Sequence, residues 1–157
     1  MGSVERGARV RFPPPVVFLL CVAAGVGLGY GLAPIQVPVE RSIRIVAGVA
    51  VQLLAVALVV SARILFRRTG QNPVPWKPSP ELLLDGPYRF TRNPMYVGVT
   101  LFQIGLGVTL DNLWISLLAA PALLAVHFIA VLPEERYLSE KFGEPYDRYL
   151  TRVRRYL

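Results

Sequence analysis

The sequence has little charge and almost no cysteine. Charged residues make up 17% of its 157 residues, whereas soluble domains carry about 25%. Apolar residues make up 54%, and the mean hydropathy is +0.47. The single cysteine, Cys21, excludes a disulfide within the chain and a metal site built from several cysteines. The shortage of charge predicts a protein that lies in lipid.

Positive charge nevertheless predominates, with 17 basic against 10 acidic residues and a formal net charge of +7. The basic residues stand in short stretches between apolar runs. We therefore interpret them as contacts to anionic lipid headgroups and as topology signals. We expect membrane lipid among the partners and no nucleic acid, and the oligomeric state is left open.

Four apolar runs are long enough to cross a bilayer, which takes about 20 helical residues. The second run extends past Arg63, whose long side chain can reach the interface. Only Asp111 and Asn112 separate the third run from the fourth, so we expect a tight hairpin there. The predicted spans cover residues 16–32, 45–66, 93–110 and 112–133.

The basic residues also predict the orientation of these spans. With the N-terminus inside, fifteen of them fall on inner segments and only Arg41 and Arg44 on outer ones. Positive charge marks the cytoplasmic side, so both termini and the polar segments 67–94 and 133–157 are expected there. The inner residues are Arg6, Arg9, Arg11, Arg63, Arg67, Arg68, Lys77, Arg89, Arg92, Arg136, Lys141, Arg148, Arg152, Arg154 and Arg155.

The predicted fold class is all-α, an integral membrane helical bundle with about four transmembrane helices in a single domain, residues 1–157. A C-terminal amphipathic helix is expected on the cytoplasmic face. Its apolar side has the spacing i, i+3, i+4, i+7 and consists of Tyr146, Tyr149, Leu150 and Val153. Its basic side consists of Arg148, Arg152 and Arg155.

Small residues recur inside the first span. A nucleotide-binding loop is not expected there, because that motif follows a strand and Tyr30 interrupts the glycine pattern. The pairs Gly25/Gly29 and Gly27/Gly31 have the spacing of close helix contacts. We predict the same role for Gly98, Gly105 and Gly107, and hydrogen bonds between helices for Gln52 and Gln103.

The segment 67–94 contains six prolines and is not expected to form one helix. Its three consecutive leucines, 82–84, indicate packing against an apolar surface, and Trp76 is a candidate interfacial anchor. The third span then begins with Asn93 as the predicted cap and Pro94 in the first helical position. Such a helix start also offers free N–H groups to an anion.

Three ionisable residues near the end of the fourth span are candidate functional groups. Glu134 and Glu135 follow Pro133, where the span is expected to end. They form either the solvated first turn of a helix or a binding site for a cationic ligand. His127 lies inside the apolar run, where it is either functional or held between helices by one hydrogen bond.

Four short motifs between about residues 80 and 155 resemble the isoprenylcysteine carboxyl methyltransferase group, which includes the membrane phospholipid methyltransferases. Their order and spacing together carry the resemblance. They are Gly86-Pro87-Tyr88, Arg92-Asn93-Pro94-Met95-Tyr96-Val97-Gly98, Glu134-Glu135-Arg136-Tyr137-Leu138 and Phe142-Gly143-Glu144-Pro145-Tyr146-Asp147-Arg148-Tyr149.

The resemblance implies S-adenosylmethionine as the cofactor, bound by residues 67–157, while residues 1–66 supply two spans. By position, Glu134 is expected to bind a polar group of the cofactor, such as its ammonium. Candidate substrate residues are His127, Arg92 and Arg89, and neither a catalytic residue nor a metal ligand is predicted. The implied cofactor-binding residues are Glu81, Leu82, Leu83, Tyr88, Asn93, Pro94, Met95, Tyr96, Glu134 and Glu135.

Two positions depart from the family pattern. Asn93 stands where many members have histidine, so no acid–base role is expected there. Ala130 stands where eukaryotic carboxyl methyltransferases place an arginine for the substrate, one turn before the acidic pair. We therefore expect a neutral or weakly polar lipophilic acceptor, and the sequence does not choose between a carboxylate, an amine and a thiol.

The leading hypothesis is a membrane methyltransferase that depends on S-adenosylmethionine and acts on a lipophilic acceptor, similar to isoprenylcysteine carboxyl O-methyltransferase. A membrane reductase of the sterol-reductase type is a second hypothesis, but it would need more spans and more basic residues for the 2′-phosphate of NADPH. A non-catalytic helical membrane protein is a third, and it would not need the ordered acidic, Arg-Asn-Pro and tyrosine motifs.

The charge distribution generates a topology prediction. A cysteine introduced at Asn112, with Cys21 replaced, is expected to react with a membrane-impermeant reagent from the outer side only, because both termini are cytoplasmic. Labelling of oriented vesicles checks this. Reaction from the cytoplasmic side alone would overturn the predicted orientation.

Overall fold

The computed structural model describes residues 7–8, 10, 12–72 and 76–156, and in these ranges all regular secondary structure is helical. Arg6, Arg9, Arg11, Pro73 and Pro75 of the sequence argument lie outside them. The elements are α1 (Pro14–Gly31), α2 (Arg41–Arg68), η2 (Gly86–Arg89), α3 (Pro94–Thr109), α4 (Leu113–Leu117), α5 (Ala119–Val126), η3 (His127–Val131), α6 (Leu132–Phe142) and α7 (Glu144–Arg152).

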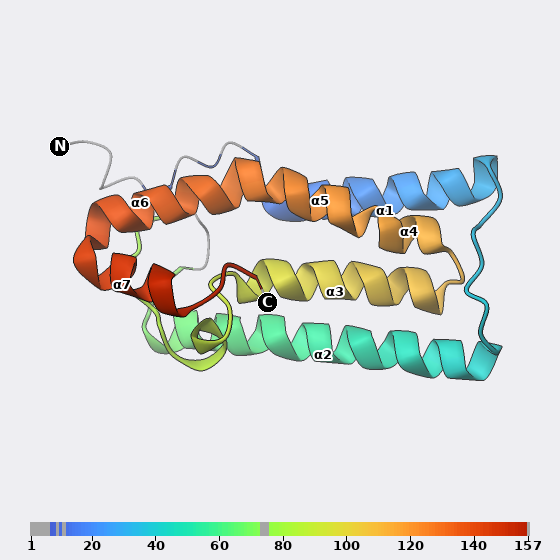
Figure 1. Ribbon diagram of the computed structural model, residues 1–157, viewed down its shortest axis with the longest axis horizontal. Helices are drawn as coiled ribbons and strands as arrows, with labels where there is room; N and C mark the ends of the chain where they lie inside the picture. The colour runs from blue at the N-terminus through green and yellow to red at the C-terminus, as the bar shows by residue number, and fades with distance from the viewer. Residues whose placement is uncertain (1–6, 9, 11, 73–75, 157) are drawn as a thin grey trace.

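The helices form two layers (Figure 1). One layer contains α1 with α4 and α5, and the other contains α2 and α3, which pack along each other. The connection between α1 and α2 crosses one end of the bundle, and α6 and α7 lie at the other end. The chain after α7 returns to the beginning of α3. The two ends of the bundle are therefore built from different parts of the sequence.

Three helical stretches are long and apolar enough to cross a membrane: Pro14–Gly31, Arg41–Arg68 and Leu113–Phe142. The helix α3, predicted as a span, is apolar but has 16 residues. The helix α2 begins at residue 41, before the predicted 45, because the Glu40 carboxylate caps it by accepting from the Ser42 N–H at 3.1 Å.

The last apolar run is not one regular helix. The helices α4 and α5 are followed by one turn of π-helix, η3, which leads directly into α6. The prediction that the helix ends at Pro133 is wrong. Pro133 lies in the first turn of α6, where the missing N–H group of a proline costs no intrahelical hydrogen bond. The helix then continues to Phe142. Glu134 and Glu135 therefore lie within a continuous helical stretch and not at the beginning of a separate helix.

Glycines set the distance between several helices. A Cβ at Gly25 would lie 2.7 Å from the Ile115 backbone, whereas Gly27 has nothing within 4 Å. Of the two predicted glycine pairs, only the one that contains Gly25 therefore faces another helix. In α3, a Cβ at Gly105 would lie 2.8 Å from the backbone oxygen of Gly48, which confirms the predicted close approach to α2. Gln103 also bridges helices, as predicted, by donating to the Ile115 oxygen at 2.9 Å.

At the end of the bundle far from α6, Asp111 joins the α3–α4 turn to the α1–α2 connection. Its carboxylate accepts from the Val37 backbone N–H at 2.8 Å and pairs with the Arg44 guanidinium at 2.5 Å. The predicted hairpin at Asp111 and Asn112 is thus present. Two segments that are distant in sequence are tied by one carboxylate.

Asn112 holds the same turn to the first helix. Its side chain donates to the Gly25 oxygen at 3.1 Å and accepts from the Trp114 backbone N–H at 3.1 Å, which caps α4. A labelling cysteine at this position would remove both bonds. The exposed Arg41, at the same end of the bundle, is therefore the better position for the topology measurement.

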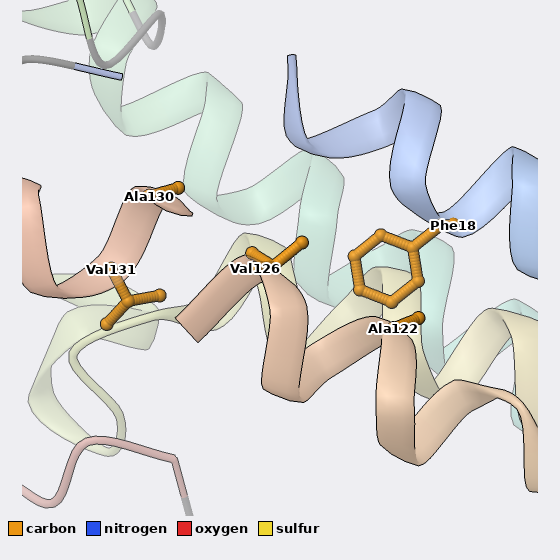
Figure 2. Packing of buried hydrophobic residues seen from close by; sticks show 5 residues of the cluster. All are labelled: Phe18, Ala122, Val126, Ala130 and Val131. Atoms are coloured by element: carbon orange, nitrogen blue, oxygen red, sulfur yellow. The ribbon is translucent and has the colours of Figure 1, made fainter. Parts of the chain in front are cut away.

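A small apolar core joins α1 to the last helical stretch. Figure 2 shows the ring of Phe18 beside Ala122, with Val126, Ala130 and Val131 following along the chain. Ala130 is 0% exposed. The position where an arginine was considered for the substrate is therefore part of the packed core, and it faces small apolar neighbours.

The glycine contacts generate a stability prediction with a control in the same helix. Gly25→Ala is expected to lower the melting temperature by several degrees, because overpacking costs about 1–3 kcal/mol. Gly27→Ala is expected to leave it unchanged or raise it, since Ala favours a helix over Gly by about 0.5–1 kcal/mol. Thermal unfolding in detergent measures both. Equal melting temperatures for the two variants would contradict the close approach of α1 and α4.

Candidate functional site

Two cavities meet at the end of the bundle near α6 and α7. The inner cavity has a volume of about 50 Å³, and the large cavity about 430 Å³. The inner cavity is lined by Phe66, Gln71, Ser79, Glu81, Leu82, Leu83, Tyr88, Arg92, Asn93, Glu134, Glu135, Leu138 and Tyr146. The large cavity is lined by Pro14, Pro15, Phe18, Val59, Arg63, Phe66, Asn72, Trp76, Tyr88, Arg92, Asn93, Met95, Tyr96, Val99 and Glu134.

The wall between the cavities carries most of the polar chemistry. The residues that line both are Phe66, Tyr88, Arg92, Asn93 and Glu134. They come from the end of α2, from η2, from the turn before α3 and from the first turn of α6. A ligand at this junction would contact groups from all four elements. From the junction, the large cavity extends between the apolar helices α1, α2 and α3. The inner cavity extends toward loop 76–85 and α7.

The two adjacent carboxylates of α6 have different surroundings. The side chain of Glu135 is 12% exposed and is held by two arginines. The side chain of Glu134 lines both cavities, and no hydrogen bond or ion pair joins its carboxylate to another residue that the structure describes. Glu135 is thus no solvated helix start, and Glu134 is the carboxylate that a cationic ligand would meet.

The partners of Glu135 come from opposite sides. Arg92 places Nη1 3.0 Å from Oε1. Arg155 donates from Nε to Oε1 at 3.0 Å and from Nη2 to Oε2 at 2.8 Å, in the two-pronged geometry that arginine and carboxylate favour. The Glu135 carboxylate is therefore paired from two sides, and the side chain of Arg155 stays 36% exposed. The position of Arg155 differs from the prediction, which placed this residue on the basic side of the C-terminal helix.

The C-terminal tail, residues 153–156, is tied to the turn before α3 by backbone bonds. The Arg92 N–H donates to the Arg154 oxygen at 3.0 Å, and the Asn93 amide donates to the Arg155 oxygen at 3.0 Å. Asn93 occupies the cap position of α3 as predicted, but its side chain makes no capping bond. Its amide serves the tail, which brings residues 62 apart in sequence into contact.

Buried tyrosines complete the inner wall. The Tyr149 hydroxyl donates to the Tyr88 backbone oxygen at 2.7 Å and so holds α7 against η2. Burial, together with the nearby Glu134 carboxylate, raises the pKa of the Tyr88 hydroxyl well above its usual range. Burial and the two α6 carboxylates likewise raise the pKa of Tyr146. At neutral pH both hydroxyls keep their protons, so they can donate hydrogen bonds and are poor bases.

The structure brings together nine of the ten residues implied for the cofactor. Seven line the inner cavity, namely Glu81, Leu82, Leu83, Tyr88, Asn93, Glu134 and Glu135. Met95 and Tyr96 line the large cavity. Pro94 is fully buried and lines neither of them. Contact with a cofactor stays a prediction for each residue.

The three candidate substrate residues are separated. Arg92 lies at the junction of the cavities, whereas Arg89 lines a separate hollow beside Arg148 and Arg152. His127 lines neither cavity, and its Nδ1 lies 2.8 Å from the Tyr156 hydroxyl. The alternative of one hydrogen bond between packed elements therefore describes His127 in this structure. A role in substrate binding stays a prediction for His127 and Arg89.

Several lining residues were not among the predicted site residues. Tyr146 was taken only as the apolar side of an amphipathic helix, and Phe66 only as the end of a span. Gln71 and Ser79 lie in the proline-rich segment, which carries no periodic pattern. For Tyr146 the signal was present, because it lies inside the fourth quoted motif. The positions of Phe66, Gln71 and Ser79 at the cavity are visible only in the folded structure.

An apolar groove between α2 and α3 continues the large cavity sideways. Its residues are Ala55, Val56, Val59, Val60, Gly98, Val99 and Phe102. Val59 and Val99 belong to both the groove and the large cavity. Val56 and Phe102 are exposed on the outside of the bundle. The cavity is therefore continuous with a surface of the kind that lipid covers.

Comparison with known proteins adds two findings. Residues 43–145 match the family model described as phospholipid methyltransferase. A stretch of 72 residues is 33% identical to the protein-S-isoprenylcysteine O-methyltransferase of Schizosaccharomyces pombe. This stretch makes up 46% of the chain and 30% of the yeast protein, so the similarity covers less than a third of that relative. The family match includes η2, α3 and the first part of the C-terminal helices.

Proposed function

This chain belongs to the phospholipid methyltransferase family, and from that premise we propose that it transfers a methyl group from S-adenosylmethionine to a lipophilic acceptor in the membrane. One observation carries the proposal. A polar cavity contains a carboxylate, that of Glu134, which has no hydrogen-bond or ion-pair partner among the described residues, and it meets a more apolar cavity that adjoins the groove on the outside of the bundle. A cationic, water-soluble methyl donor and a lipophilic acceptor need this combination.

The residues around the inner cavity fit the cofactor chemically. Glu134 offers a carboxylate for the ammonium group. The Arg92 Nε and the Gln71 Oε1 are buried and have no hydrogen-bond partner among the described residues. Buried polar groups are rarely left unpaired, so a donor and an acceptor at this place support a polar ligand. Leu82 and Leu83 supply an apolar wall for an adenine ring.

We place the cofactor in the inner cavity and the adjoining junction, and the acceptor in the rest of the large cavity. The inner cavity is too small for the whole cofactor, whereas ligand pockets usually have about 300–1,000 Å³. The junction residues Tyr88, Asn93 and Glu134 would then contact both ligands. This arrangement agrees with the position-by-position resemblance, in which the same residues line the cofactor.

The bound cofactor would supply a methyl group on a sulfonium, and transfer of that methyl group to the acceptor would break its bond to sulfur and release a neutral thioether. The residues of the chain bind and orient the two ligands and exclude water, which are the main requirements of such a displacement. Tyr88 keeps its proton and serves as a hydrogen-bond donor, because its pKa is raised. We assign no general base, because displacement at a sulfonium depends mainly on positioning and the exclusion of water.

The acceptor is proposed to be neutral or weakly polar and to reach the site sideways from the membrane. The groove between α2 and α3 is lined by apolar residues only. Arg92, the arginine at the junction, is already paired with Glu135. Arg63, which also lines the large cavity, is exposed and does not line the inner cavity. A bare carboxylate at the junction would therefore compete with Glu135 for Arg92, and burying it without a fixed partner is costly. A thiol or an amine has no such requirement.

We further propose that α3 is a fourth crossing and that the site lies on the cytoplasmic side. Its 16 residues extend about 24 Å at 1.5 Å per residue, a length that a bilayer accommodates by thinning. Four crossings put the ends of α2 and α6, with their basic residues, on one face. The excess of basic residues at this end supports the cytoplasmic assignment.

The carboxylate of Glu134 generates a binding prediction. Glu134→Gln is expected to weaken S-adenosylmethionine binding about tenfold or more, because a hydrogen bond to a charged group contributes roughly 1.5–3 kcal/mol. Glu140→Gln, which changes an exposed acid of the same helix, should bind like the parent. Titration calorimetry in detergent measures all three. Equal affinities of the two variants would refute the role of Glu134.

The side groove generates a prediction about the acceptor. Methylation of a lipid extract by purified protein, followed by mass spectrometry, identifies the acceptor. Val99→Trp is then expected to raise the KM for that acceptor several-fold and to leave cofactor affinity unchanged, since Val99 lies where groove and cavity join. Leu54→Trp, on the exposed face of α2, is the control. An unchanged KM for Val99→Trp would exclude access through the groove.

A further inference from the structure

We propose that the C-terminal tail, residues 153–156, positions the site, and that Arg155 acts through Glu135 to keep Glu134 available to a cationic ligand. The proposal rests on the proposed function, because the cationic ligand is the ammonium end of the methyl donor. It assigns Arg155 as a positioning residue. The side chain of Arg155 lines neither cavity and reaches the site only through Glu135.

The tail reaches three separate elements within four residues. Its backbone oxygens accept from Arg92 and Asn93 in the turn before α3, as described above, and the Arg155 oxygen also accepts from the Thr91 hydroxyl at 3.1 Å. The Arg155 guanidinium holds Glu135 on α6. The Tyr156 hydroxyl lies 2.8 Å from His127 Nδ1 in the π-helical turn. The tail thereby joins the beginnings of α3 and α6, which supply three of the five junction residues, Arg92, Asn93 and Glu134.

The charges explain why this matters for ligand binding. The guanidiniums of Arg92 and Arg155 are both paired with the Glu135 carboxylate, and Glu134 is the adjacent acid on α6. Both guanidiniums are directed at Glu135, so among the described residues no cation is paired with Glu134. Without Arg155, Arg92 is the one remaining cation of this group and is attracted by both carboxylates. It would compete for Glu134 with the ammonium of the ligand.

The backbone and side-chain contributions of the tail can be separated. Arg155→Ala removes the guanidinium and leaves the carbonyl oxygen that Asn93 and Thr91 bind. The fold of the turn before α3 is therefore retained while the charge arrangement changes. Arg155→Lys restores one positive charge but not the two-pronged contact. Arg152→Ala is the matched control, because Arg152 is exposed and lies in the hollow away from the junction.

Two ligands distinguish a local charge effect from a loss of structure. S-adenosylmethionine carries the ammonium group, and methylthioadenosine has the adenosine part without it. Arg155→Ala is expected to weaken S-adenosylmethionine binding about tenfold, the size of one charged hydrogen bond, and to leave methylthioadenosine binding unchanged. Arg155→Lys should recover most of the affinity. Arg152→Ala should bind both ligands like the parent protein.

A double-mutant cycle tests the route through Glu135. Because Arg155 acts on the ligand through this carboxylate, Arg155→Ala in a Glu135→Gln background is expected to cause little further loss of S-adenosylmethionine affinity. Additive losses, or an equal loss for both ligands in Arg155→Ala, would overturn the proposal. So would parent-like binding by Arg155→Ala. If the folded parent protein binds no S-adenosylmethionine, the proposed function itself fails, which is a different result.

Discussion

The carboxylate of Glu135 joins the parts of this protein that form the site. Arg92 reaches it from the beginning of α3 and Arg155 from the end of the chain. A carboxylate with 12% exposure needs such partners, since an unpaired buried charge is costly. Once they are in place, the beginnings of α3 and α6 and the tail are fixed against one another. The position of Glu134, one residue earlier, depends on this arrangement.

The opposite end of the bundle is organised by the same principle. There Asp111 binds Arg44 and the Val37 N–H, and so joins two connections between helices. Between the two ends, the contacts are made by small residues, as at Gly25 against Ile115 and Gly105 against Gly48. Apolar side chains gain little by leaving lipid for a helix interface, so close packing and polar bonds must hold the helices together. Polar clusters at both ends and glycines along the middle meet this requirement.

This arrangement also separates two chemical environments. The inner cavity is bounded by carboxylates, two amides, an arginine and tyrosines, and the groove beyond Val99 is lined by apolar residues. The junction around Tyr88, Asn93 and Glu134 lies between them. A reaction between a charged donor and a lipophilic acceptor requires contact between such environments without mixing them. Tyr146 of α7 lines the polar side, while the apolar groove opens on the outside of the bundle at Val56 and Phe102.

Much of the architecture follows from the sequence alone. The apolar runs predict where the helices lie, because a backbone in lipid must satisfy its hydrogen bonds within the helix. The hairpin at Asp111 is confirmed for the same local reason, and a helix is present at Glu144–Arg152, where the amphipathic helix was predicted. The motif around Glu134 identifies the region of the site, since those residue types suit a cationic ligand.

Other features were decided only by tertiary structure. The helix continues through Pro133 because a π-helical turn precedes it, and no local sequence pattern predicts that turn. Arg155 was assigned by its periodicity to the basic side of the C-terminal helix, yet it binds a carboxylate 20 residues away in sequence. Residue spacing along one helix reports which side chains share a face. Residue spacing carries no information about which distant segment that face will contact. The contacts between distant segments are what bring Arg155, Asn93 and Glu135 together.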